Sequence, residues 1–410
     1  MAFPLPAPVE RRSVFPSWTN WVRHVVDSEL PLVRNHQRES IQRTVNHFTT
    51  SMFGQLILPT GCGKTGVAIL LPYYMGVSRV LVLAPHPDLA SQLNDAFCGP
   101  HCLPRDPVPS RQDDAFVFKI ELDLADGRDV SYQDNEANRN TLLPARAYPN
   151  DPQEMGNFLR GDLLVINHKK IQPHTSLKQS DLPLDYDLLI VDEAHHYPVE
   201  TWRAIMQHYR GPISRTKILF LTATPNTDHI APVVPTIWNY SFRTAVNDRA
   251  IRDIEFTELQ GPQERVLQDL VAQLKAMVGR FDTVDCRYQA MIEVRGRDVE
   301  LVLDLYNQGM DDGNPEVAKA CIQGSPRDLV DDFKRGTFRT MVVIHKLMEG
   351  FDNPNVAFVI VARAMGMRTF NQFVGRATRI GDGSVPVAQV LSHATFAQQK
   401  NFNAMHDGGD

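Results

Sequence analysis

The chain has 410 residues, of which 43% are hydrophobic and 22% are charged, and its formal net charge is −6. This composition is ordinary for a globular protein, and at about 150 residues per domain the length predicts two or three domains. The acidic balance argues against a protein that coats nucleic acid over its whole surface, although a local basic groove stays open. No apolar run approaches the roughly 20 residues of a membrane span, and the start of the chain lacks the apolar core of a secretory signal. We therefore expect an intracellular protein, in the cytoplasm or nucleus, that does not bind membranes.

The five cysteines are too few and too irregularly spaced for a disulfide framework, which favours a reducing compartment. Cys98, His101 and Cys102 lie close together in the sequence. A closed zinc site needs four ligands, however, and no second Cys/His pair has matching spacing. We therefore interpret this group as a loop that carries small thiols.

Residues 1–30 are expected to be a flexible N-terminal extension that ends in a short helix. From residue 33 onward, apolar or small residues recur at the spacing of a helix face. This segment contains Gln37, whose amide can donate to and accept from the two edges of adenine at once. A solvated helix is an equally good interpretation of this segment when it is considered alone.

A short apolar run that ends at Leu58 leads into Thr60-Gly61-Cys62-Gly63-Lys64-Thr65, and a helical pattern follows from Gly66 to Tyr74. Strand, glycine-rich turn and helix form the context of a phosphate-binding loop (P-loop), in which backbone N–H groups and the helix dipole face an anion. Lys64 is expected to neutralise the β- and γ-phosphates, and Thr65 to offer a hydroxyl to Mg²⁺. Leu58 stands where the pattern usually has glycine, so a chance glycine loop is the alternative.

Two further apolar runs, 80–84 and 162–167, predict buried parallel strands. Between them, residues 99–155 are rich in proline, aspartate and asparagine and have weak periodicity, although 116–122 could be a strand. We interpret this segment as an insertion or long loop, which in such proteins is usually functional or mobile.

A third apolar run, 186–191, leads directly into Asp192-Glu193-Ala194-His195, a DEAH sequence. The end of a strand places Asp192 at the carboxyl edge of an open α/β sheet, where ligands bind. Asp192 can hold Mg²⁺, and Glu193 can orient and deprotonate an attacking water. The strand predicted at 217–222 ends similarly, because Thr222 and Thr224 place hydroxyls that can bond the acidic pair and transmit a change in phosphate state.

The second half repeats the alternation of strands and helices, and the boundary between domains is placed near 240–255. Strands are expected at 288–294, 340–344, 355–362 and 385–391, and helices at 263–280, 298–307, 326–335 (with Ser325 as its cap) and 371–379. In the last helix, Gln372, Arg376 and Arg379 would share one face. Two guanidinium groups from a second domain suit the transition state at a γ-phosphate, whereas a solvated basic face is the alternative.

Taken together, these motifs resemble the superfamily 2 DEAD/DEAH-type helicases, and they are most similar to the branch that includes the ATPase subunits of restriction enzymes. The resemblance covers roughly residues 33–395. It is carried, in the order of the family, by Gln37, Gly61 to Thr65, Pro85 with Gln92, Asp192 to His195, Thr222 to Thr224, Gly350 with Asp352, and Gln372 with Arg376 and Arg379.

This resemblance implies an α/β fold of two tandem RecA-like domains, each a mainly parallel sheet flanked by helices, with ATP in the cleft between them. The first domain would span 31–245 and the second 246–395, followed by a C-terminal tail, 396–410. The implied nucleotide-binding residues are Gln37, Thr60, Gly61, Cys62, Gly63, Lys64, Thr65, Gly350 and Asp352, with Asp352 near the ribose. Lys64, Glu193, Arg376 and Arg379 would be catalytic, Thr65 and Asp192 would hold Mg²⁺, and His195, Thr222, Thr224 and Gln372 would couple the site to nucleic acid.

The implied activity is hydrolysis of ATP to ADP and phosphate, used to move along or unwind DNA or RNA through contacts mainly with the phosphate backbone. Membership of a larger complex stays open. Three positions differ from the family pattern in segments that face the nucleic acid: His86, Ile344-His345 and Met291-Ile292-Glu293. These differences motivate an alternative, an ATP-gated clamp or remodelling subunit that does not unwind processively.

Overall fold

A computed structural model of the protein describes residues 14–28, 33–85, 89, 90, 93, 97, 163–167, 184–196, 205–209, 214–223, 234–278, 280, 287–311, 314–322, 325–326, 328–344, 351, 353–380 and 387–407. The chain forms two compact units, of which the first comprises Met1–Leu58 and Gly63–Asn239 and the second Pro59–Cys62 and Tyr240–Asp410. Several predictions fall outside the described residues, namely the insertion at 99–155, the Cys98/His101/Cys102 group, His86, His345, Thr224, Gly350 and Asp352.

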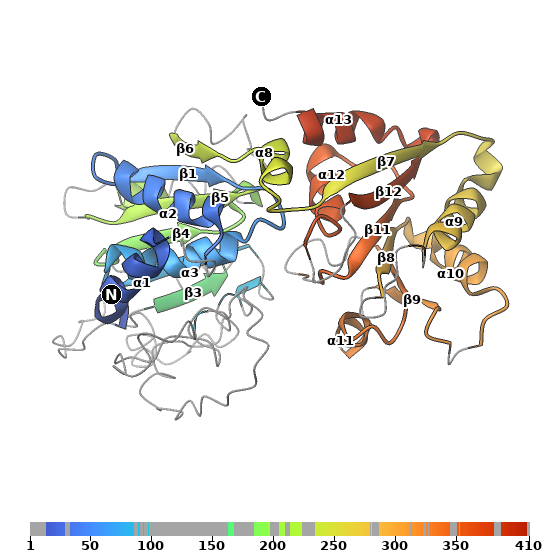
Figure 1. The fold of residues 1–410 in the computed structure, drawn as a ribbon, viewed down its shortest axis with the longest axis horizontal. Helices are drawn as coiled ribbons and strands as arrows, with labels where there is room; N and C mark the ends of the chain where they lie inside the picture. Colours follow the sequence, from blue (N-terminus) through green and yellow to red (C-terminus); the bar gives the residue numbers. More distant parts are fainter. Residues whose placement is uncertain are drawn as a thin grey trace, which may run out of the picture. The chain divides into compact units, whose positions relative to one another are not determined.

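The first unit is built on a six-stranded sheet with the order β3-β2-β4-β5-β1-β6, and every neighbouring pair is parallel (Figure 1). All residues of β2 and β4 are buried, as expected for parallel strands that are covered on both faces. One face of the sheet packs against Ile205, Met206 and Tyr209. The strands are β1 (Phe53–Ile57), β2 (Val80–Ala84), β3 (Leu163–Asn167), β4 (Leu188–Val191), β5 (Lys217–Thr222) and β6 (Thr236–Asn239).

Three helices of the first unit pack together: α1 (Val14–Asp27), α2 (Asn35–His47) and α3 (Lys64–Met75). α3 ends at Gly76, whose φ of 68° is the left-handed conformation that glycine adopts without strain at the end of a helix. α1 is tied to its neighbours by polar bonds, since Arg38 Nε donates to the Val26 carbonyl at 2.5 Å and the Tyr74 hydroxyl donates to Asp27 Oδ1 at 2.9 Å. The N-terminal helix is therefore an integral part of this unit.

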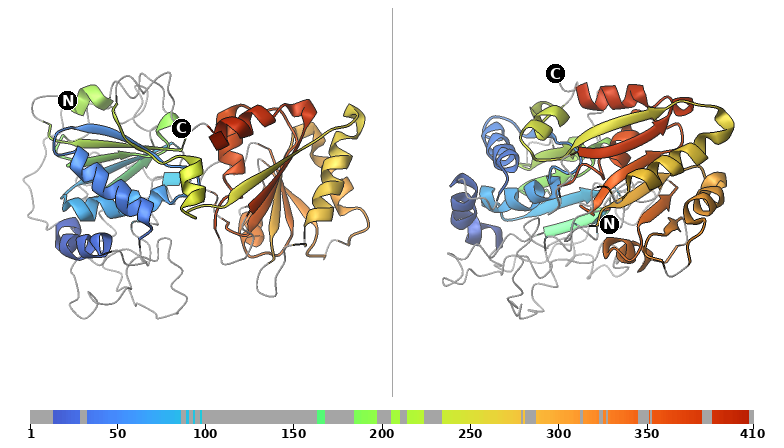
Figure 2. Two further views of the ribbon diagram at one scale, coloured as in Figure 1. Left: turned by 45° about the horizontal axis from the view of Figure 1, so that its top comes forward. Right: turned by 45° about the vertical axis from the view of Figure 1, so that its right-hand side comes forward.

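The second unit contains another six-stranded sheet, with the order β7-β12-β11-β8-β10-β9 and parallel pairing throughout. Its strands are β7 (Asp253–Leu259), β8 (Gln289–Glu293), β9 (Ala318–Cys321), β10 (Thr340–Val343), β11 (Val356–Val361) and β12 (Val387–His393). Figure 2 shows α9 (Val266–Met277) and α10 (Val299–Asn307) on one face of this sheet, and α12 (Met367–Val374) and α13 (Gln399–Asp407) on the other. The unit also contains α8 (Phe242–Asn247) and α11 (Asp328–Lys334).

Three strands are absent from the expectations drawn from the sequence: β6, β7 and β9. All three lie at an edge of a sheet, where one side of the strand has no neighbour. Polar residues interrupt these three strands, so they lack the continuous apolar run of a parallel strand covered on both faces, which the edge strand β3 does have. In β7, apolar and polar residues alternate instead, since the polar Glu255 lies between Ile254 and Phe256.

The compact units divide between Asn239 and Tyr240, whereas the expected domains divide between 245 and 246. The segment between the two boundaries contains most of α8, and this helix packs against α13 in the second unit. α11 begins at Asp328 rather than at 326, and the Ser325 hydroxyl accepts from the backbone N–H of Ile322 at 2.9 Å.

One expectation about the last predicted helix is wrong. α12 ends at Val374, so Arg376 and Arg379 lie beyond it and do not share a helix face with Gln372. After Gly375 the chain tightens into a turn, in which the N–H of Arg376 bonds to the Phe373 carbonyl at 3.1 Å and that of Ala377 to the Val374 carbonyl at 2.9 Å. These three-residue spacings replace the four-residue spacing of an α-helix, and they rotate both arginines away from the expected register.

Candidate nucleotide-binding site

The predicted P-loop connects β1 to α3, as expected. Gly61 has a φ of 91° and Gly63 a φ of 74°, which are left-handed conformations that residues with a Cβ rarely adopt. α3 begins at Lys64, directly after Gly63, so Lys64 and Thr65 are its first two residues. The backbone N–H groups of a first helical turn have no partner within the helix, and the helix dipole is positive there. The loop thus has the backbone conformation of an anion site.

Gln37 is 5% exposed, so the alternative of a solvated side chain is wrong. Its Nε2 donates to the carbonyl of Gly63 at 3.1 Å, and its Oε1 accepts from the backbone N–H of Arg34 at 3.1 Å. The amide therefore links the start of α2 to the residue that precedes Lys64. Contact between Gln37 and adenine stays a prediction.

Asp192 and Glu193 follow β4, which lies between β2 and β5 in the middle of the sheet. Asp192 is 6% exposed, and its N–H donates to the Leu83 carbonyl at 3.0 Å, which continues the ladder with β2 by one residue. Glu193 has a φ of 45°, an unusual conformation for a residue with a side chain. Strained backbone of this kind is concentrated at functional sites, because the surrounding structure must enforce it.

The turned backbone brings Glu193 to the P-loop. Its Oε1 lies 3.5 Å from Lys64 Nζ, although the two residues are far apart in the sequence. The two side chains are only 17% and 10% exposed, respectively, so the ion pair is largely shielded from water. A cation and a candidate base therefore face each other at the start of α3.

The same carboxylate faces His195, whose Nδ1 lies 3.5 Å from Glu193 Oε2. His195 Nδ1 is also 2.8 Å from the hydroxyl of Thr222, the last residue of β5. Both side chains are buried. Polar contacts therefore connect the P-loop lysine through Glu193 and His195 to the end of the neighbouring strand.

The oxygen atoms of Thr65 and Asp192 suit a magnesium ion better than a metal that is held entirely by protein side chains. Among the described residues, no group of three or more His, Cys, Asp or Glu side chains could hold a metal ion. Magnesium does not require such a cage, because it binds through one or two protein oxygens, substrate phosphates and water. The hydroxyl of Thr65 on α3 and the carboxylate of Asp192 after β4 offer oxygen ligands of the kind that magnesium prefers.

In the second unit, Gln372 is buried on α12 and Arg376 is buried in the turn that follows it. Arg376 Nη1 donates to the carbonyl of Phe351 at 2.5 Å, so the alternative of a solvated basic face is wrong for this residue. Arg379 lies after the turn and is partly exposed. Arg252 also bonds to the backbone of this turn. It was not predicted from the sequence, because a single arginine before an edge strand belongs to no recognisable motif.

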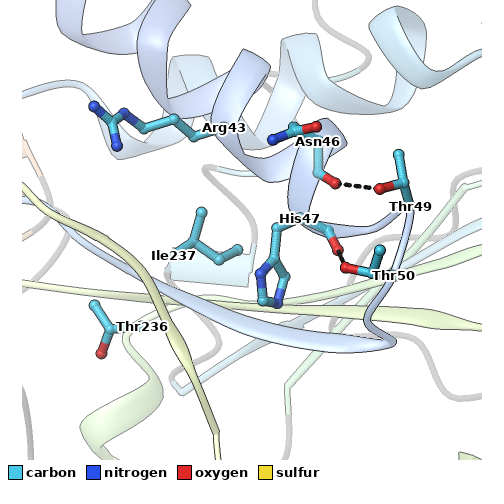
Figure 3. Close-up of a pocket in the computed structure, with 7 residues that line it drawn as sticks. All are labelled: Arg43, Asn46, His47, Thr49, Thr50, Thr236 and Ile237. Carbon is cyan, nitrogen blue, oxygen red and sulfur yellow. Dashed lines mark hydrogen bonds between the residues drawn. The ribbon is translucent and has the colours of Figure 1, made fainter.

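A pocket of about 380 Å³ lies elsewhere in the first unit (Figure 3). It is bounded by the last turn of α2, the segment that follows it and the edge strand β6. None of the predicted site residues lines it. Its lining residues are Arg43, Asn46, His47, Thr49, Thr50, Thr236 and Ile237.

Comparisons with known proteins agree with the motifs and the fold. Residues 31–227 match the profile of the family described as "Type III restriction enzyme, res subunit". No curated protein matches the chain. No helix in the described part of the chain is long and apolar enough to cross a membrane.

Solved structures similar to this chain include the ATP-dependent Type ISP restriction-modification enzyme LlaBIII bound to DNA, with a TM-score of 0.57 and 16% identity over 88% of this chain and 27% of that one. The Mycobacterium smegmatis helicase Lhr bound to ssDNA and AMP-PNP has a TM-score of 0.54 and 14% identity, over 91% of this chain and 47% of that one. Mss116p bound to ssRNA and AMP-PNP has a TM-score of 0.59 and 13% identity, over 98% of this chain and 79% of that one. The chain thus spans much less than the whole of LlaBIII or Lhr.

At these identities the structural likeness establishes the fold, which is α/β with two RecA-like parallel sheets flanked by helices. The resemblance to superfamily 2 helicases that was drawn from the sequence motifs is confirmed.

Proposed function

We propose that this chain is a helicase-type ATP hydrolase that converts ATP to ADP and phosphate in order to move along or unwind DNA or RNA. The observation that carries the proposal is the ion pair between Lys64 of the P-loop and Glu193 of the DEAH sequence, 3.5 Å apart. A phosphate-binding cation and a carboxylate that can act as a base are the two groups that hydrolysis of a phosphoanhydride needs at one place.

In this proposal, Lys64 exchanges its partner when ATP binds. The triphosphate carries more negative charge than one carboxylate, and it would enter the loop against the first N–H groups of α3. Lys64 would then neutralise the β- and γ-phosphates and release Glu193. The freed carboxylate would take a proton from the attacking water, while Thr60, Gly61, Cys62 and Gly63 shape the loop.

The adenine and the ribose would be recognised outside the P-loop. Gln37 is held by Gly63 and Arg34, so its amide plane has a defined orientation. We propose that it recognises adenine, and that Gly350 and Asp352 lie close to the nucleotide, with Asp352 near the ribose.

Thr65 and Asp192 would hold the magnesium ion that accompanies ATP, through the hydroxyl and the carboxylate. When bound, the ion supplies positive charge that stabilises the β- and γ-phosphate oxygens.

Arg376 and Arg379 would stabilise the charge that develops on the γ-phosphate. Guanidinium groups suit this role because they remain protonated and offer several donors in one plane. The burial of Arg376 and its bond to Phe351 support a defined position for this group before ATP binds.

Coupling to nucleic acid is proposed to begin at His195, because it contacts both Glu193 and Thr222. A change in the partner of Glu193 would alter this contact and thereby the end of β5, and we propose that Thr224, two residues further along the sequence, takes part as well. Gln372 would take part from the second unit. Contacts with the nucleic acid would be mainly to the phosphate backbone, as in other sequence-independent proteins, and would weaken with salt.

One observation favours the second candidate, an ATP-gated clamp or remodelling subunit. β8 ends in Glu293, which is fully buried and pairs with Arg363 at 2.8 Å, so this strand end does not present a polar side chain to a nucleic acid. A clamp would hydrolyse ATP and bind nucleic acid, but it would not displace a strand from a tailed duplex.

The test is ATP hydrolysis by the full chain with Mg²⁺, measured alone and with single- and double-stranded DNA and RNA. We expect at least one of these nucleic acids to stimulate turnover and the stimulation to fall as salt rises. The same preparations in a strand-displacement assay with tailed duplexes distinguish unwinding from clamping. If the folded chain hydrolyses ATP equally with and without every nucleic acid, the proposed coupling is wrong.

A further inference from the structure

Arg252 is a buried arginine at the entrance to the second sheet. It lies between α8 and β7, and only 3% of its surface is exposed. A guanidinium group is expensive to remove from water unless its N–H donors find acceptors. The location of those acceptors therefore indicates what the residue holds together.

The donors of Arg252 reach two separate segments of the second unit. Nη2 donates to the Pro354 carbonyl at 3.1 Å and Nη1 to the Val356 carbonyl at 3.2 Å, at the start of β11. Nη1 also lies 3.5 Å from the Ala377 carbonyl, and the backbone N–H of Arg252 donates to the Thr378 carbonyl at 2.6 Å. Arg252 thus joins the entry of β11 to the turn that follows α12.

That turn carries both arginines proposed to act on the γ-phosphate. Ala377 directly follows Arg376, and Thr378 directly precedes Arg379. Because α12 has already ended at Val374, no α-helical hydrogen-bond ladder continues here, and the local bonds are those of the turn and one from the Thr378 hydroxyl to the Gly375 carbonyl at 3.0 Å. The contacts from Arg252 supply long-range anchors at the two residues that lie between Arg376 and Arg379.

Arg376 also bonds to the segment that leads into β11. Arg376 Nη1 donates to the Phe351 carbonyl, and Arg252 bonds the carbonyls of Pro354 and Val356, so the two guanidinium groups hold the same short segment on either side of Asn353. A shift of this segment would therefore be transmitted to the turn through both arginines.

We propose that Arg252 is a positioning residue for Arg376 and Arg379, an inference that rests on the proposed function. It orders the backbone between them, so that their guanidinium groups are oriented before the γ-phosphate develops its transition-state charge. Preorganised donors of this kind lower the barrier because they need not reorganise during the reaction.

The geometry requires arginine rather than a positive charge alone. The planar fork directs two nitrogens toward different carbonyls, whereas a lysine ammonium is a single point on a flexible chain. Arg252→Lys is therefore expected to keep the charge and lose part of the connection, and Arg252→Met to keep the approximate volume and lose all side-chain bonds.

The experiment measures nucleic-acid-stimulated ATP turnover by full-length Arg252→Lys and Arg252→Met, together with their thermal unfolding. We expect kcat to fall by about tenfold to a hundredfold in Arg252→Met and by less in Arg252→Lys, with KM for ATP changed by less than about threefold. The matched control is Arg339→Met, because Arg339 is 1% exposed at the start of β10 and has no contact with the turn among its described bonds. This control should unfold at a lower temperature and keep the parent kcat per folded molecule.

A double-mutant cycle separates positioning from a structural role. If Arg252 acts through the two arginines, combining Arg252→Lys with Arg376→Ala or with Arg379→Ala should lower kcat by less than the product of the separate effects in at least one cycle. Multiplicative losses in both cycles, or equal kcat losses in Arg252→Lys and Arg339→Met, would overturn the proposal. If neither Arg376→Ala nor Arg379→Ala lowers kcat, the proposed role of these two arginines is wrong. That result differs from the outcomes above, which overturn only the positioning role of Arg252.

Discussion

The two units hold their candidate site residues in different ways. In the first unit, Lys64 begins a helix and Asp192 directly follows a central strand, so the backbone of regular elements positions the charges. In the second unit, Arg376 and Arg379 lie in a turn beyond a helix, and the turn is anchored by side-chain bonds from Arg252. Each charge of the first unit is thus positioned by the helix or strand that it adjoins, whereas the turn of the second unit depends on a few long-range bonds. Substitutions in the first unit should therefore remove chemistry, and some in the second should also loosen structure.

The largest effect is expected for Lys64→Ala. Without the ammonium group, the phosphates lose their main protein cation, so ATP turnover should fall to background, about a thousandfold or more. Turnover by the purified variant measures the loss. Lys400→Ala, on an exposed position of α13, is the matched control and should keep the parent rate. Turnover close to the parent rate in Lys64→Ala would mean that the loop is not the catalytic phosphate site.

Glu193→Gln should lower kcat nearly as much, by about a hundredfold or more, because a neutral amide cannot accept the proton of the attacking water. Binding of ATP should persist, since the loop and Lys64 remain. Binding of a fluorescent ATP analogue and single-turnover hydrolysis measure the two properties separately. Glu264→Gln changes an exposed carboxylate and serves as the control. Hydrolysis at the parent rate by Glu193→Gln would show that another group is the base.

The arginines test the contrast between the units directly. Arg376→Ala and Arg379→Ala should each lower kcat by about a hundredfold, because each removes positive charge from the γ-phosphate. Only Arg376→Ala should also destabilise the fold, by about 1–3 kcal/mol, since it leaves the buried Phe351 carbonyl without this donor. Urea unfolding and steady-state turnover check both. An unchanged kcat in Arg379→Ala would remove it from the site, and equal stabilities would contradict the anchoring of Arg376.

The smallest effect is expected at Tyr74, whose hydroxyl bonds α3 to Asp27 of α1 and which is not one of the proposed catalytic residues. Burial, reinforced by the hydrogen bond to Asp27, raises the pKa of Tyr74 to about 12 in the folded protein, compared with 10.0 for the free side chain. The folded state therefore holds this proton more tightly, and its contribution to stability is present below the unfolded pKa and is lost as pH rises toward the folded one.

We expect the unfolding free energy of the parent to fall between about pH 10 and about pH 12, and Tyr74→Phe to lack part of that slope. Urea unfolding across this range checks the expectation. As a control, both proteins should hydrolyse ATP at the same rate at neutral pH, because the substitution leaves the P-loop intact. An identical slope in the parent and in Tyr74→Phe would show that Tyr74 does not contribute.

Much of the fold followed from local patterns. The buried apolar runs predicted β2, β4, β5, β8, β10 and β11, because a parallel strand covered on both faces has a recognisable composition. The edge strands β6, β7 and β9 did not follow, since polar residues interrupt their apolar pattern, whereas the uninterrupted apolar run of the edge strand β3 was predicted. Similarly, helical spacing placed Arg376 on a helix face, whereas the turn after Gly375 removes it from the helix.

By itself, the sequence determined the P-loop, the DEAH sequence and the two-sheet α/β architecture, because each of these depends on residues that are adjacent or regularly spaced. Only the tertiary structure decided that Glu193 faces Lys64, that Gln37 is bonded to Gly63, and that Arg252 holds the turn beside Arg376. These contacts join residues that are distant along the chain. Their partners are set by how strands are ordered and where helices end, and no local pattern specifies either.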